Sequence, residues 1–62
     1  MLTKIASLYK DNDPEVFSKV YLNEITGYYE VHYYDETIKE EPPVGLFTKY
    51  LQAIESAREW TI

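Results

Sequence analysis

The sequence predicts an α+β fold: an antiparallel sheet of three strands, or four, packed against one C-terminal helix. Apolar and polar residues alternate with a period of two over much of residues 2–35, which is typical of β-strands with one buried face. From about Gly45 to Trp60 the apolar residues recur with the period of an α-helix. Sixty-two residues are enough for a single small domain, residues 1–62. Strands followed by a helix favour the α+β class.

The first predicted strand, Leu2–Tyr9, alternates only weakly, with Ile5, Ser7 and Tyr9 on one side. A single helical turn would fit Ile5 and Leu8 equally well. The segment Asp11-Asn12-Asp13-Pro14 follows and predicts a turn, because Asp and Asn side chains bind nearby backbone groups and proline lacks a donor.

The most informative feature is a tyrosine-rich hairpin, in which Glu15–Leu22 and Tyr28–Asp35 flank the turn at residues 23–27. Gly27 occupies the last turn position, where a left-handed residue is common. If Asn23 pairs with Tyr28, the apolar residues of both strands share one face, whereas a slip of one residue would mix apolar and charged positions. The predicted inner pairs are Leu22 with Tyr29, Val20 with Val31 and Ser18 with Tyr33. The predicted outer pairs are Tyr21 with Glu30, Lys19 with His32 and Phe17 with Tyr34.

The residues after the hairpin predict a short strand at the edge of the sheet, followed by the helix. Thr37-Ile38-Lys39 is a candidate short edge strand, and Pro42 and Pro43 end any pairing. We expect Trp60 to anchor the helix in the core rather than to form an exposed recognition tail. The predicted helical stripe contains Leu46, Phe47, Tyr50, Leu51, Ile54 and Ala57, widened by Ala53 and Trp60.

Composition excludes several classes of protein. With no cysteine and one histidine, the chain has no disulfide, thiolate zinc site or histidine-rich metal site. Eleven acidic and six basic residues give a net charge of −5, which argues against direct binding to nucleic acid. No apolar run approaches the roughly 20 residues of a membrane span, and the N-terminal residues lack a signal-peptide core. We therefore expect a cytoplasmic protein, in the host cell if it is viral.

No catalytic or cofactor motif stands out. Asp11, Asp13 and Glu15 have the spacing of a calcium loop, but Val16 occupies the position that requires glycine, which favours an ordinary polar turn. His32 lies near Glu30, as a general base would, yet Ser18 projects to the other face and supplies no nucleophile. Two glycines cannot build a phosphate-binding loop. We expect no enzyme activity and no cofactor.

The outer face of the hairpin is the candidate partner-binding surface. Tyrosine is favoured at protein interfaces because it offers a large rigid area with a polar tip. Two alternatives stay open: tyrosine favours strands in general, and residues 2–9 could fold over this face. Stacking of single-stranded bases is disfavoured, because Lys19 is the one nearby basic residue. The candidate residues are Phe17, Tyr21, Tyr28, Glu30, His32 and Tyr34.

Residues 8–60 loosely resemble small uncharacterised accessory proteins of tailed bacteriophages. The cues are Leu8-Tyr9-Lys10-Asp11, the Asn-x-x-Thr-Gly turn at residues 23–27, the Tyr-Tyr-Glu-Val run at residues 28–31, and Ala57-Arg58-Glu59-Trp60. The resemblance implies a small accessory protein that binds and redirects a host protein, and it carries over no functional residue.

Three functional hypotheses follow. The first is a non-enzymatic protein-interaction module, such as a phage-encoded modulator of a host protein, that uses the aromatic face and flanking acidic residues. The second is an acidic mimic of nucleic acid, in which phosphates are imitated by Asp11, Asp13, Glu15, Glu30, Asp35, Glu36, Glu40 and Glu41. The third is a homodimer in which the aromatic face pairs with itself.

Overall fold

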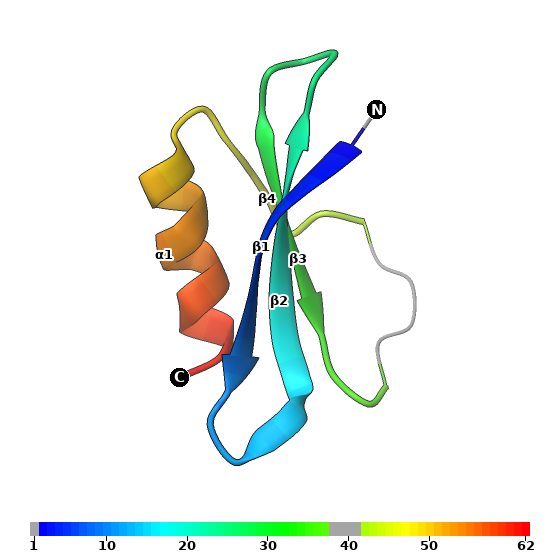
Figure 1. Ribbon diagram of the computed structural model, residues 1–62, viewed down its shortest axis with the longest axis vertical. Coiled ribbons are helices and arrows are strands. Elements are labelled where there is room, and N and C mark those ends of the chain that lie inside the picture. Colours follow the sequence, from blue (N-terminus) through cyan, green and yellow to red (C-terminus); the bar gives the residue numbers. More distant parts are fainter. Residues whose placement is uncertain (1, 38–41) are drawn as a thin grey trace.

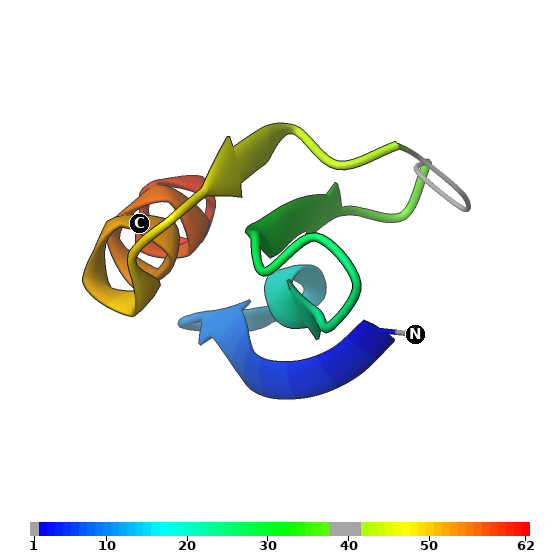
Figure 2. The ribbon, with the colours of Figure 1, turned by 90° about the horizontal axis from the view of Figure 1, so that it is seen from above.

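The computed structural model describes residues 2–37 and 42–62 and has two layers (Figure 1). Within these residues four strands form one antiparallel sheet in the order β1-β2-β3-β4, and a single helix covers one face of it (Figure 2). The predicted α+β class is confirmed, with four strands. The elements are β1 (Leu2–Lys10), β2 (Asp13–Asn23), β3 (Tyr29–Tyr34), β4 (Gly45–Phe47) and α1 (Tyr50–Trp60).

The hairpin has the predicted register throughout. All six predicted pairs between β2 and β3 are present, from Phe17 opposite Tyr34 to Leu22 opposite Tyr29. The Asn23 backbone N–H donates to the Tyr28 carbonyl at 2.9 Å, which closes the loop where the sequence indicates. Alternation fixes this register because a slip of one residue would move every apolar side chain to the other face.

The turn of this hairpin is held by Asn23. Its side-chain Oδ1 accepts hydrogen bonds from the backbone N–H groups of Ile25 and Thr26, at 3.0 and 3.2 Å. Gly27 has a φ of +79°, the left-handed conformation that costs glycine no side-chain clash, and its N–H donates to the Asn23 carbonyl at 2.7 Å. Residues 23–27 therefore form the turn that their composition predicts.

The first strand forms the edge of the sheet beside β2, so it extends the sheet instead of folding over it. A bulge interrupts the pairing: Lys4 lies opposite Tyr21 and Ala6 opposite Val20, which leaves Ile5 unpaired. The extra residue reverses the alternation, so Lys4 shares a face with Ser7 and Tyr9, and the expected grouping of Ile5 with them is wrong.

The core lies between the sheet and α1. Its fully buried apolar residues, among those described, are Val20, Val31, Ala53 and Ala57. The small alanine side chains let the helix backbone approach closely, and the buried Ser18 Oγ donates to the Ala57 carbonyl at 2.8 Å.

The last turns of α1 are fastened to β3 through aromatic side chains. The Tyr33 hydroxyl donates to the Ser56 carbonyl at 2.8 Å, and Trp60 Nε1 donates to the Tyr34 carbonyl at 2.7 Å. The rings of Tyr33 and Trp60 stack at 4.8 Å. Trp60 thus packs against the sheet, as expected, rather than forming a free recognition tail.

The predicted start of the helix is wrong. Gly45–Phe47 forms β4, which pairs with Tyr29–Val31, and α1 begins only at Tyr50. A three-residue apolar segment after two prolines satisfies its backbone polar groups on the open edge of β3. Leu51, predicted in the buried stripe, is 72% exposed.

The candidate strand at residues 37–39 lies partly outside the described residues. Thr37 itself is not in a strand: its N–H and hydroxyl both donate to Asp35 Oδ1, at 2.8 and 2.6 Å.

No helix in the described part of the chain is long and apolar enough to cross a membrane.

Candidate functional site

The sheet face opposite α1 carries a row of aromatic rings. We call Tyr9, Phe17, Tyr21, His32 and Tyr34 the outer-face ring cluster. Tyr9 comes from β1, Phe17 and Tyr21 from β2, and His32 and Tyr34 from β3, so the cluster crosses three strands. These residues reach one face because they occupy alternate, cross-strand positions in the two registers.

The rings of the cluster stand side by side. Phe17 and Tyr34 stack with centroids 4.8 Å apart and planes at 11°, and Tyr9 lies 5.5 Å from Phe17 on the other side. The Tyr21 ring meets His32 edge to face at 5.2 Å. Phe17 and Tyr34 therefore each have one ring face covered by the other, whereas the Tyr9 ring stays 58% exposed.

Lys19 lies among these rings. Its Nζ is 5.6 Å from the Phe17 centroid and 5.4 Å from the Tyr34 centroid, within the range of a cation–π interaction. Lys19, the basic residue that the sequence places near this face, is therefore engaged within the protein, and the structure adds Lys4, opposite Tyr21, to the same face.

The side chains of His32, a member of the cluster, and of the neighbouring Glu30 are largely covered. Their side chains are 12% and 14% exposed, and His32 Nε2 lies 3.5 Å from Glu30 Oε1. Nε2 is buried and forms no hydrogen bond with the described residues, whereas Glu30 Oε2 accepts one from Asn23 Nδ2 at 3.0 Å. Through Glu30 and Asn23, His32 is thus linked to the hairpin turn.

The pKa of one hydroxyl group in the cluster is raised by its surroundings. Burial raises the pKa of Tyr34, and the neighbouring Tyr21 raises it further by charge repulsion and by a hydrogen bond. Tyr34 therefore keeps its proton to higher pH than an exposed tyrosine.

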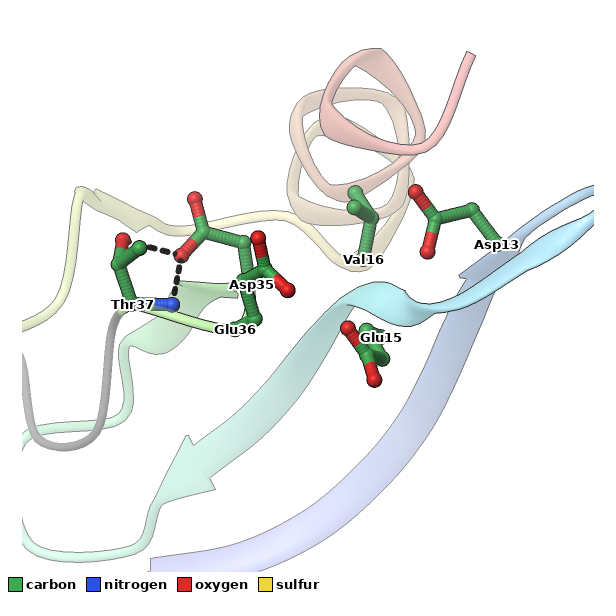
Figure 3. A pocket seen from close by; sticks show the side chains of 6 residues that line it. All are labelled: Asp13, Glu15, Val16, Asp35, Glu36 and Thr37. Atoms are coloured by element: carbon green, nitrogen blue, oxygen red, sulfur yellow. Dashed lines mark hydrogen bonds between the residues drawn. The ribbon is translucent and has the colours of Figure 1, made fainter.

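An acidic hollow of about 250 Å³ is formed by residues next in sequence to Phe17 and Tyr34, and Figure 3 shows the side chains that line it. A hydrogen bond with Glu36 and repulsion from its carboxylate raise the pKa of Glu15, with smaller contributions from burial and Asp13. No group of three or more potential ligands within the described residues is placed to hold a metal ion. The hollow is lined by Asp13, Glu15, Val16, Asp35, Glu36 and Thr37.

The structure brings most of the predicted site residues together. Phe17, Tyr21, His32 and Tyr34 are members of the cluster, and Glu30 contacts it through His32. Tyr28 lies outside it: β3 begins at Tyr29, and Tyr28 sits in the turn with its side chain 42% exposed.

Sequence reasoning missed Tyr9. Its ring is 58% exposed and forms the β1 end of the cluster. Alternation grouped Tyr9 with Ser7 but could not place them relative to the hairpin, because the register shifts between Tyr9 and Lys10, next to the turn. Counting outward from the predicted turn at residues 11–14 would pair Tyr9 with Val16, so the sequence carried no signal that places Tyr9 opposite Phe17.

No protein-family model matches the sequence, and neither a curated protein nor a solved structure is significantly similar to it. The resemblance to bacteriophage accessory proteins therefore stays a prediction.

Proposed function

We propose that this protein is a non-enzymatic protein-interaction module that binds its partner through the outer-face ring cluster. The observation that carries the proposal is the position of five rings on the sheet face opposite the only helix described. The helix buries the inner tyrosines, Tyr29 and Tyr33, but leaves the outer ones without a covering element in the described chain. Clustered aromatic residues on such a face are typical of protein interfaces.

The ring arrangement favours a protein partner over single-stranded nucleic acid. A platform for bases needs ring faces that are open to stacking and a surrounding positive charge. Here Phe17 and Tyr34 cover each other, and the neighbouring hollow is acidic. Tyrosine rings with their hydroxyl groups instead suit the mixed apolar and hydrogen-bonding contacts of a protein surface.

Charge complementarity indicates the chemistry of the partner. The net charge is −5, and Glu15 and Glu36, each two residues from a ring of the Phe17–Tyr34 pair, crowd each other. A partner with an apolar centre flanked by lysine or arginine would contact the rings and relieve this repulsion. If the resemblance to phage proteins holds, the partner is a host protein.

The test compares two pairs of substitutions in the tagged protein. Tyr9→Ser with Tyr21→Ser removes exposed area from the cluster, whereas Ile25→Ser with Leu51→Ser removes exposed apolar area elsewhere. The partner captured from a lysate of the native host is identified, purified and titrated against each variant. We expect the first pair to weaken binding at least tenfold, since buried interface tyrosines each contribute more than about 1 kcal/mol, and the second to change it little.

Equal affinities for both variants, with unchanged circular dichroism, would show that the cluster is not the contact surface. Self-association that depends on Tyr9 and Tyr21, measured by light scattering, would make the partner a second copy of the chain.

A second candidate function, acidic mimicry of nucleic acid, is favoured by the carboxylates around the hollow. It predicts a partner that normally binds nucleic acid and an affinity that falls steeply between about 0.05 and 0.5 M salt, because exposed charges are screened. An affinity that survives high salt and depends on the rings would exclude it.

A further inference from the structure

A second surface feature lies on the helix side of the molecule, between β4 and α1. It is a groove of about 390 Å³, open to solvent, and it is separate from the outer-face ring cluster. One wall is a single face of α1, because its helical residues are spaced three and four apart. The groove is lined by Phe47 of β4 and by Gln52, Glu55, Ser56 and Glu59 of α1.

The strand beside this groove has an unpaired edge. In the described sheet β4 pairs only with β3, so its other edge presents backbone N–H and C=O groups without a neighbouring strand (Figure 2). An edge strand next to a groove along a helix is the arrangement in which an extended peptide can be added as a further strand.

Phe47 is the apolar residue among those that line the groove. The Phe47 ring folds back over Gly45: a Cβ at Gly45 would lie 2.8 Å from that ring, closer than contacts allow. Glycine at this position thus lets the ring lie across the strand, where it offers a surface for a side chain of an added strand.

The groove also has a charge preference. Glu55 and Glu59 supply its charged groups, and no lysine or arginine of the described residues lines it. We propose that the groove binds an extended segment of a partner protein that carries lysine or arginine, added as a fifth strand antiparallel or parallel to β4. Backbone hydrogen bonds would hold the segment, and its basic side chains would face Glu55 and Glu59. This inference does not depend on the function proposed for the ring cluster.

The probe is an acetylated and amidated peptide, (Lys-Val)₃, titrated into ¹⁵N-labelled protein and followed by NMR. We expect saturable shifts of the backbone amides of Gly45–Phe47 and of residues 52–59. Two further peptides are methylated on backbone nitrogens, one peptide on every odd-numbered amide and the other on every even-numbered amide. Methylation of the set that faces β4 should abolish binding, and methylation of the other set should leave it, because neighbouring residues of a strand direct their backbone groups to opposite sides.

Matched variants test the charge preference. Glu55→Gln with Glu59→Gln should weaken peptide binding about fivefold, as expected for the loss of two exposed ion pairs. Glu24→Gln with Asp11→Asn changes the net charge equally but lies outside the groove, and should leave the affinity within twofold. All four residues are exposed, so the fold should tolerate both pairs.

Three results would overturn the proposal: equal binding by both methylated peptides and the unmethylated one, shifts confined to Asp13, Glu15 and Glu36, or no binding at millimolar peptide. Concentration-dependent shifts of Gly45–Phe47 without peptide would place a second copy of the chain in the groove and would also overturn it. Loss of partner binding in the Tyr9→Ser and Tyr21→Ser protein bears on the ring cluster alone, so the two proposals fail separately.

Discussion

At the scale of single residues, Ser18 is a polar side chain that stabilises the core through a hydrogen bond. It is fully buried, and its hydroxyl donates to the Ala57 carbonyl at 2.8 Å. We expect Ser18→Ala to lower the free energy of unfolding by about 1 kcal/mol, the usual net contribution of a buried hydrogen bond. Urea denaturation measures the change, with Ser7→Ala on the partly exposed outer face as the control. Equal effects of the two substitutions would mean that the bond contributes nothing.

Tyr34 supplies a residue-scale prediction about pH. Its pKa in the folded protein is raised by burial and by Tyr21, above the usual tyrosine pKa of about 10. A raised pKa means that the folded state holds this proton more tightly than the unfolded state. The resulting stabilisation is complete below pH 10 and is lost as the pH rises through the higher folded pKa.

Absorbance at 295 nm should therefore show a late-titrating tyrosine in the folded protein. Tyr34→Phe should remove this late component and the alkaline loss of stability that accompanies it, whereas Tyr28→Phe, in the exposed turn, should remove neither. A late component that persists in the Tyr34→Phe protein would assign it to another tyrosine.

At the scale of elements, the β2–β3 hairpin depends on Gly27, whose φ is +79°. Gly27→Ala should lower the free energy of unfolding by about 1 kcal/mol, because a Cβ is strained in the left-handed region. Gly27→Asn should cost less, since asparagine tolerates that conformation. No atom lies within 4 Å of a Cβ at Gly27, so the effect reports backbone conformation and not crowding. Thermal unfolding of both variants checks the order, and an asparagine variant less stable than the alanine variant would contradict it.

The hairpin was predictable because three independent signals agree: alternation, the Asn23 turn and the position of Gly27. The boundary of α1 was not, because a run as short as Leu46-Phe47 fits both a strand and a helical stripe. The face of Tyr9 was hidden by the register shift between Tyr9 and Lys10, since an irregularity beside the turn changes which residues pair and leaves no mark in the sequence. The predicted outer residues whose position depends only on the hairpin register do lie together on the sheet. Tyr28 lies outside the cluster because the strand begins one residue later.

At the scale of the whole molecule, one helix on a four-stranded sheet can cover only one face. The molecule measures 34 × 22 × 15 Å, and its small core relies on alanine and valine. Domains of this size bury a limited share of their surface, so their free energy of unfolding is small. A partner that binds the outer-face ring cluster of the folded protein would therefore also stabilise the fold. The two surfaces with unmet interactions, the ring cluster and the open edge of β4, lie on different sides of the sheet.

The most direct test of the central claim is site-specific photo-crosslinking. Tyr21 in the ring cluster, or exposed Leu51 on the helix, is replaced by p-benzoylphenylalanine, and each protein is irradiated with the purified partner. If the outer-face ring cluster is the binding surface, position 21 forms the crosslink and position 51 does not. A crosslink from position 51 alone would show that the partner binds the helix side and would contradict the account.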